Sequence, residues 1–150
     1  MAHSYIANYM HCVFSTKERR KTIKTEMKDR LWAYMGGIAK ENRMVALAIN
    51  GTDNHAHMLL SLPATICVAE ALKYIKGGSS LWVHDTFDDS STFNWQEGYA
   101  AFSVSVSRID ETIAYIKSQD IHHRRISFEE EFKKLLDKHG VKYDMRCIFG

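Results

Sequence analysis

Two histidines stand two positions apart in the segment NHAHMLLSL, which spans residues 54–62. Alternate side chains of a β-strand point to the same face, so His55 and His57 would project side by side, about 7 Å apart at Cα. Two imidazoles at that separation can converge on one divalent cation, but a third protein ligand is needed. A half-exposed strand face also accommodates histidines. The pair alone therefore does not distinguish a metal site from an ordinary strand.

A tyrosine and a glutamine four residues apart offer further chemistry in the segment IDETIAYIKSQDIHH. On a helical projection Ile109, Ile113 and Ile116 gather on one side, and Tyr115 and Gln119 fall on the opposite, polar side. Residues at this spacing are helix neighbours, about 5 to 6 Å apart at Cβ. The Gln119 amide oxygen is a possible metal ligand, and the Tyr115 hydroxyl is a possible nucleophile. A surface tyrosine is the plainer interpretation of Tyr115.

The elements that would position these residues follow from apolar periodicity. Alternation and short apolar runs predict strands over 5–15, 43–50, 55–62 and 99–107, and spacings of three and four predict helices over 25–42, 64–84, 109–123 and 128–139. The order matches an α+β, ferredoxin-like split βαβ fold, with a four-stranded antiparallel sheet, helices on one face, and C-terminal helices carrying Tyr115. The Gly77–Gly78 pair weakens the second helix, since each glycine costs about 1 kcal/mol.

Composition sets the class of protein. The chain has 150 residues, 45% apolar and 25% charged, as expected for one globular domain over residues 1–150. A net charge of +2 does not identify a nucleic-acid binder, although a local patch could act as one. The three cysteines form no CxxC pair, which indicates free thiols in a reducing cytosol. Without a signal peptide or an apolar run of about 20 residues, we expect a cytoplasmic protein without a membrane partner.

Ordered segments along the chain resemble the HUH single-tyrosine transposases, and most closely the bacterial insertion sequence 200/605 group. The resemblance covers about residues 5–140 in colinear order. It rests on YMHCVFSTKERR for the first strand and basic loop, LWAYMGGIAKENR for the first helix, DNHAHMLLSLP for the HUH strand, FNWQEGYAAFSVS for the fourth strand and YIKSQDIHHR for the tyrosine helix. The chain departs from the family pattern at Met10, which precedes His11 where tyrosine should run more directly into histidine, and at the glycine pair.

The resemblance implies roles for the four residues singled out above. His55, His57 and Gln119 would bind Mg²⁺ or Mn²⁺, and Tyr115 would be the nucleophile. The implied substrate is single-stranded DNA at transposon ends, recognised next to imperfect hairpins. The family works as a homodimer in which the tyrosine helix can serve the partner's histidine pair, so assembly of the site within one chain or between two chains stays open.

These roles define a reaction. The bound cation would stabilise charge on the scissile phosphate, and Tyr115 would attack in line to form a 5′-phosphotyrosine bond and release a 3′-hydroxyl. A second 3′-hydroxyl could reverse the step and join strands without ATP. The group that takes the tyrosine proton stays open between His122, Lys117 and water.

Basic residues are candidates for contacts with DNA phosphates. The candidates are Lys17, Arg19, Arg20 and Lys21 of the basic loop, Lys76 of the second predicted helix, and His122 and Arg124 at the end of the tyrosine helix. A solvated loop is the plainer interpretation of the first group. Tryptophans at 32, 82 and 95 could stack on bases, but packing is their commoner role.

Two other functions compete with transposition. One is a non-catalytic, ferredoxin-like nucleic-acid-binding module, such as a domesticated relative, which would not need Tyr115 and Gln119 together. The other is a metal-dependent hydrolase in which water attacks, which needs a carboxylate ligand beside the histidines. Only Asp53 is near them in the sequence, and it fits the turn. A zinc deaminase is disfavoured because its HxE and PCxxC elements are missing.

Overall fold

The sheet has four antiparallel strands. The structure is a computed structural model that describes residues 3–149. Its strands are β1 (Tyr9–Ser15), β2 (Val45–Gly51), β3 (His55–Ser61) and β4 (Ala100–Val104), in the order β2-β3-β1-β4. This order places the histidine strand β3 in the interior of the sheet. The predicted α+β, ferredoxin-like arrangement is confirmed.

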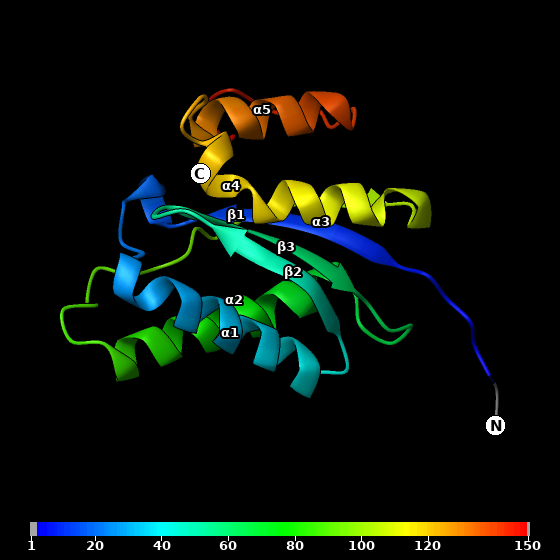
Figure 1. Cartoon of the computed structure of the whole chain (residues 1–150), viewed down its shortest axis with the longest axis horizontal. Helices are drawn as coiled ribbons and strands as arrows, with labels where there is room; N and C mark the ends of the chain where they lie inside the picture. The colour runs from blue at the N-terminus through cyan, green and yellow to red at the C-terminus, as the bar shows by residue number, and fades with distance from the viewer. Residues whose placement is uncertain (1–2, 150) are drawn as a thin grey trace.

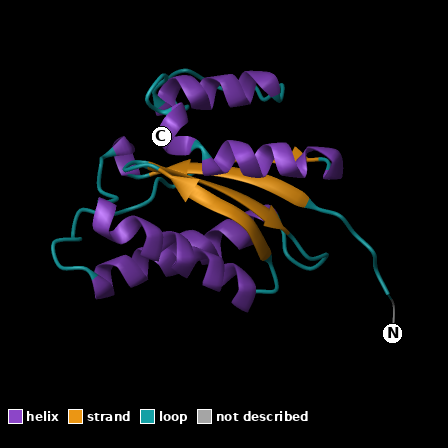
Figure 2. Ribbon diagram, in the orientation of Figure 1, coloured by secondary structure: helices purple, strands orange, loops and turns teal. Residues whose placement is uncertain are grey.

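Helices cover both faces of the sheet. Figure 1 shows α1 (Thr25–Glu41) and α2 (Val68–Thr86) on one side. On the other side lie α3 (Ile109–Lys117), α4 (Gln119–His122) and α5 (Phe128–Lys138), as the ribbon of Figure 2 also shows. Short 3₁₀ turns, η1 (Lys17–Arg19) and η2 (Val106–Arg108), follow β1 and β4. The second layer of helices closes over the face from which His55 and His57 project.

The predicted division of β3 into two faces is confirmed. Met58 and Leu60 belong to the larger core cluster, which includes the buried side chains of α1 and α2. Leu59 points the other way and packs with Ile116 of α3. Both faces of β3 are buried, so the half-exposed strand face that would tolerate incidental histidines does not exist.

The first strand is shorter than predicted. It begins at Tyr9 rather than at residue 5, and Tyr5 is 93% exposed. Tyr9 pairs with Ser61, and the last bond at this end runs from the Leu62 amide to the Asn8 carbonyl. Pro63 follows, and because proline has no amide proton it cannot extend the ladder.

The predicted helix over 109–123 is broken at Ser118, and this corrects the expectation of one continuous helix. The side-chain amide of Asn50 in β2 donates to the carbonyls of Ile116 at 3.0 Å and Lys117 at 3.1 Å. These carbonyls would otherwise accept from the amides one turn later. A side chain from a distant strand therefore ends α3 and lets α4 turn toward the sheet.

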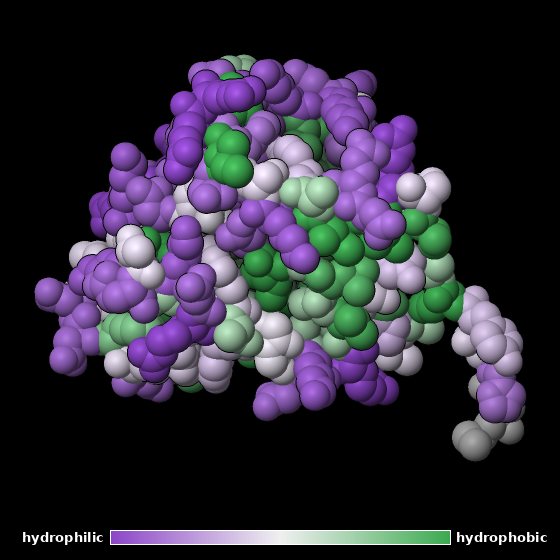
Figure 3. Space-filling model, in the orientation of Figure 1, coloured by the Kyte–Doolittle hydropathy of each residue, from purple (hydrophilic) through white to green (hydrophobic). Residues whose placement is uncertain are grey.

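The three tryptophan side chains mostly pack against other residues, the role that the sequence favoured over stacking on bases. Trp32 and Trp95 are each 8% exposed and lie in the larger core cluster, while Trp82 is partly buried and stacks on Tyr34 with ring centroids 4.7 Å apart. Figure 3 shows hydrophobic residues gathered between α3 and the α1–α2 layer, at the edge of the sheet where β2 lies. Val45 of that strand is 55% exposed.

The glycine pair does not interrupt α2, and the two positions differ in their surroundings. A Cβ at Gly78 would lie 2.9 Å from Ile38 Cδ1 of α1, whereas a Cβ at Gly77 would meet nothing within 4 Å. Gly78→Leu should therefore lower the free energy of unfolding by about 1–3 kcal/mol through overpacking. Gly77→Leu, the matched control, should leave it unchanged or raise it by up to about 1 kcal/mol. Urea unfolding would measure both, and equal effects would contradict this account of the helix contact.

Candidate metal and nucleophile site

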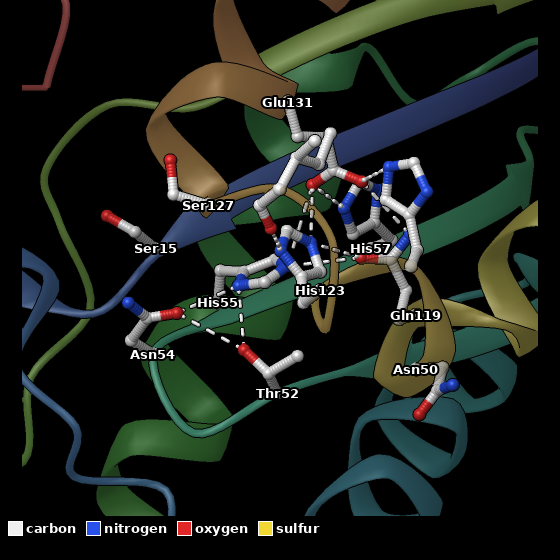
Figure 4. A network of polar contacts seen from close by, with 12 residues as sticks. Ser15, Asn50, Thr52, Asn54, His55, His57, Gln119, His123, Ser127 and Glu131 are labelled. Atoms are coloured by element: carbon white, nitrogen blue, oxygen red, sulfur yellow. Dashed lines mark hydrogen bonds and ion pairs between the residues drawn. The ribbon is translucent and has the colours of Figure 1, made fainter.

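Both strand histidines present Nε2 to the same buried space. His55 and His57 are each 0% exposed. His55 Nδ1 lies 2.9 Å from both Asn54 Oδ1 and Thr52 Oγ1, which belong to the β2–β3 turn (Figure 4). His57 Nδ1 lies 2.8 Å from Nε2 of His11, a buried residue of β1 on the same face of the sheet. Partners on Nδ1 hold each ring so that the other nitrogen is available for a cation.

The structure brings Gln119 to the histidines. Gln119 is 0% exposed, and its Oε1 lies 3.1 Å from His55 Nε2. The break at Ser118 makes this approach possible, because Gln119 begins α4 instead of continuing the polar face of α3. Gln119 lies beside a strand histidine, as the sequence predicted, but it does so from the start of α4 and not from the polar face of one long helix.

Sequence reasoning missed the carboxylate at the centre of the site. Glu131 of α5 is 1% exposed. Its Oε1 lies 2.9 Å from His57 Nε2, and its Oε2 accepts from Gln119 Nε2 at 3.1 Å. A signal was present, since Glu131 stands on the apolar stripe of its helix, three residues after Phe128 and four before Leu135. An acidic residue at a core position of a helix is a candidate ligand.

His123 also lies in the site, although its position among basic residues at the end of the predicted helix gave no sign of this. It lies in the turn after α4, and its Nε2 is 3.0 Å from both Gln119 Oε1 and Glu131 Oε1. The ligand atoms of His55, His57, His123 and Glu131 all lie within 4.8 Å of one another. These residues could hold a metal ion.

Tyr115 lies in α3 and is partly buried beside the histidines. Its hydroxyl donates a hydrogen bond to Glu131 Oε2 and lies 3.4 Å from His122 Nε2. Tyr115 and Gln119 therefore meet, through the carboxylate of Glu131. Burial, with the negative charge of Glu131 next, raises the pKa of Tyr115 above its ordinary value, so the phenol keeps its proton in this arrangement.

Burial and mutual charge set the protonation of the site. Burial, followed by repulsion from His57, lowers the pKa of His11 to about 3 and that of His55 to about 3. Burial raises the pKa of Glu131, but hydrogen bonds from His123 and His57 outweigh it and hold that pKa below its usual range. The site at neutral pH thus combines the ionised carboxylate of Glu131 with the neutral imidazoles of His11 and His55, and ionised carboxylate and neutral imidazole are the forms that bind metals.

The basic candidates fall into three structural situations. Lys17, Arg20 and Lys21 are exposed, and Arg124 is exposed beyond α4. Arg19 is paired with Glu129 of α5 at 2.8 Å, so the basic loop is tied to the helix that carries Glu131. Lys76 donates to the carbonyls of Glu97 and Gly98 at 3.0 and 2.8 Å, and so stabilises the loop that precedes β4.

A cleft reaches Tyr115 from outside. It has a volume of about 280 Å³ and lies between β4, α3 and α5. Its lining includes His11 and Tyr115 on the side of the site, and the cationic residues Arg108 and Lys138. A larger groove of about 780 Å³ lies beside the basic loop and includes Lys17 and Arg19.

Comparison with known proteins identifies the family. The family model described as "Transposase IS200 like" matches residues 4–119, which is more than half of the chain. The chain belongs to the IS200-like transposase family. The matched region includes His55, His57, Tyr115 and Gln119, and it ends before His123 and Glu131.

The relatives of this transposase-family chain agree in sequence and fold. It is 28% identical over 89 residues to the transposase for insertion sequence element IS200 of Salmonella typhimurium and to that of Salmonella typhi. The aligned residues cover 59% of this chain and 59% of each relative. A crystal structure of a candidate transposase from Deinococcus radiodurans is 22% identical, with a TM-score of 0.63 over 79% of this chain and 96% of that one.

The fold also resembles a protein bound to DNA. The structure of a REP-associated tyrosine transposase bound to a REP hairpin is 15% identical, with a TM-score of 0.60 over 82% of this chain and 73% of that one. At such identities the two solved structures show the fold alone. Within residues 3–149, none of the helices has the length and apolar character that crossing a membrane requires.

The lowered histidine pKa values predict that acid destabilises the fold. Between about pH 6.5 and 3 the unfolded chain binds protons at His11 and His55 that the folded chain does not bind, because their pKa is about 3 when folded. The free energy of unfolding should therefore fall as pH falls through this range. Below about pH 4.5 protonation of Glu131 in the unfolded chain adds to the loss, because its folded pKa is lower.

Denaturant unfolding between pH 7 and 4, with a chelator present, would measure this slope. His11→Leu should reduce the slope by about one proton, since one of the two shifted histidines is gone. The exposed His3→Leu is the control and should leave the slope as it is. A slope unaffected by His11→Leu would show that His11 is not held neutral by burial.

Proposed function

We propose that this chain is a DNA transposase that cleaves and rejoins single-stranded DNA through a covalent 5′-phosphotyrosine intermediate. Tyr115 is the proposed nucleophile, and His55, His57 and Gln119 are proposed ligands of Mg²⁺ or Mn²⁺. One observation carries the proposal: Tyr115 and Gln119, about sixty residues from the histidines in the chain, meet them around one buried carboxylate. Membership of the IS200-like transposase family supports the same activity.

The residues of the site divide the work of the cleavage step. His55, His57 and Gln119 would hold the cation, which would supply positive charge to stabilise the phosphate in the transition state. Glu131 Oε2 accepts the hydrogen bond of the Tyr115 hydroxyl, and so orients that oxygen and takes its proton as the phenol oxygen bonds to phosphorus. The bond between phosphorus and the 3′-oxygen breaks, and that oxygen leaves as a 3′-hydroxyl after taking up a proton. Partners on Nδ1 hold the rings of both strand histidines so that Nε2 points into the site.

The proposed substrate is single-stranded DNA beside a hairpin at a transposon end. The cleft next to Tyr115 has the cationic Arg108 and Lys138 on its lining, which suits a phosphodiester chain. The basic loop with Lys17, Arg20 and Lys21 extends the positive surface at the other end of the site. Arg19, His122 and Arg124 are further proposed contacts, whereas the bonds of Lys76 to two carbonyls make it the least available. The similarity in fold to a hairpin-bound transposase supports recognition of a hairpin.

A homodimer is part of the proposal. Hydrophobic residues lie at the open edge of the sheet beside β2 (Figure 3), and they could be covered by a second copy. Within the single chain Tyr115 already contacts Glu131, which in turn contacts His57. This continuity supports a site assembled in cis rather than one that borrows the partner's tyrosine.

A second candidate is a metal-dependent phosphodiester hydrolase in which water attacks. It requires a carboxylate beside the histidine pair, and Glu131 is such a carboxylate. This candidate gives Tyr115 no covalent role, and that difference separates the two functions experimentally.

Cleavage by the proposed route should leave protein attached to DNA. The chain is mixed with a labelled single-stranded DNA hairpin carrying 5′ and 3′ flanks, and with Mn²⁺, and is then denatured and separated by electrophoresis. The wild-type chain should form a covalent adduct that resists denaturation. Tyr115→Phe should abolish the adduct, since no other oxygen occupies that position. Tyr74→Phe, an exposed tyrosine of α2, is the matched control and should form the adduct normally.

Three results would contradict the transposase proposal. Cleavage that survives Tyr115→Phe would favour the hydrolase. Hairpin binding without cleavage, with Mn²⁺ or Mg²⁺ present, would favour a non-catalytic nucleic-acid-binding module. An adduct that survives Tyr115→Phe but not Tyr74→Phe would assign the nucleophile elsewhere.

A further inference from the structure

Five side-chain donors face one buried space between β3, α4 and α5. Nε2 of His57 and of His123 lie 2.9 and 3.0 Å from Glu131 Oε1, and Nε2 of His55 and of His123 lie 3.1 and 3.0 Å from Gln119 Oε1. Donors bound to one cation at about 2.0–2.2 Å are themselves about 3.0–3.5 Å apart. The spacing therefore matches a coordination shell, although hydrogen bonds have similar lengths.

The outer nitrogen of His123 must carry a proton. His123 Nδ1 lies 3.0 Å from the backbone carbonyl oxygen of Ile126, which can only accept a hydrogen bond. His123 Nε2 therefore points inward, where it faces two oxygens, Oε1 of Gln119 and Oε1 of Glu131, each 3.0 Å away.

The outer nitrogen of His55 is also held. His55 Nδ1 lies 2.9 Å from both Asn54 Oδ1 and Thr52 Oγ1 of the β2–β3 turn. His55 Nε2 therefore points into the same buried space, where it faces Gln119 Oε1 at 3.1 Å.

The ligand atoms of His55, His57, His123 and Glu131 all lie within 4.8 Å of one another. Gln119 Oε1 lies beside two of them. One cation in this space could contact all of these donors, since none is farther from another than two metal–ligand bonds can span.

We propose that His123 and Glu131 are ligands of the same cation as His55, His57 and Gln119, so that three imidazole nitrogens, one carboxylate oxygen and one amide oxygen surround it. This inference deepens the proposed function and rests on its cation site. The two added ligands lie beyond residues 4–119, the part of the chain that the family model matches. They come from α5 and the turn before it, which close over the strand histidines.

The donor set determines the class of metal. Imidazole nitrogen suits Mn²⁺, Co²⁺ and Zn²⁺, and Mg²⁺ prefers oxygen ligands and retains several waters. A buried shell of three nitrogens should therefore select a transition metal over Mg²⁺. Glu131 would bind the cation through Oε1 while Oε2 holds the Tyr115 hydroxyl, so one carboxylate would link the metal to the nucleophile.

Metal binding without DNA tests the ligand set. The whole chain, stripped with a chelator, is titrated with Co²⁺, and affinities for Mn²⁺, Zn²⁺ and Mg²⁺ follow from competition. We expect one Co²⁺ per chain with visible absorption typical of low coordination number, and Mg²⁺ binding at least about tenfold weaker than Mn²⁺. Glu131→Gln and His123→Gln should each weaken Co²⁺ binding by at least about tenfold. Glu130→Gln and His84→Gln, both exposed, are the matched controls and should bind normally.

Proton NMR of the Co²⁺-loaded wild-type chain gives a readout that needs no variant to fold. Each bound imidazole has a ring N–H on Nδ1, whose signal is strongly shifted by the paramagnetic ion and disappears in D₂O. Three such signals would support ligation by His123 together with the strand histidines. Two signals would overturn it, as would unchanged affinity in both Glu131→Gln and His123→Gln.

The outcome separates this inference from the proposed function. If the metal titrations and NMR support the proposed ligands but no DNA adduct forms, the ligand set is supported and the transposase proposal is contradicted. The inference would be overturned if the wild-type chain forms an adduct that requires Tyr115 while the Glu131→Gln variant binds metal normally and cleaves DNA faster. In that case Glu131 would occupy the position of the scissile phosphate.

Discussion

The buried carboxylate of Glu131 is the interaction on which the rest of the site depends. An ionised carboxylate without partners is costly inside a protein, so its two oxygens require several donors or a cation. Its partners come from separate elements: His57 from β3, Tyr115 from α3, Gln119 from α4 and His123 from the following turn. Satisfying this one charge therefore fixes the distance of α5 from the sheet and the mutual positions of the residues proposed for chemistry.

Two further contacts set the frame around that charge. The Asn50 side chain takes the carbonyls at the end of α3, so the chain turns at Ser118 and Gln119 enters the site. The pair between Arg19 and Glu129 joins the basic loop to α5. Contact with DNA at the loop would therefore act on the same helix that holds Glu131.

The charge state of the site suits a cation. Burial keeps His11 and His55 neutral, and hydrogen bonds from His123 and His57 keep Glu131 ionised, which are protonation states suited to binding a cation. Burial and the negative charge of Glu131 raise the pKa of Tyr115 and keep the phenol protonated. Positive charge beside Glu131 would offset the effect of that carboxylate on Tyr115, so the proposed cation would act on the proposed nucleophile as well as on a phosphate.

The sequence by itself determined the four-stranded fold, the two faces of β3 and the candidacy of His55, His57, Tyr115 and Gln119. Those features follow from local periodicity and from residue order, which a linear sequence displays directly. Only the tertiary structure decided the break at Ser118 and the presence of Glu131 and His123 in the site. The break depends on a side chain from β2, and the two added residues depend on how α5 docks. Both are contacts between distant segments: the pattern of α5 marks Glu131 as an acidic residue at a core position, but the pattern within one segment does not show which distant residues it will meet.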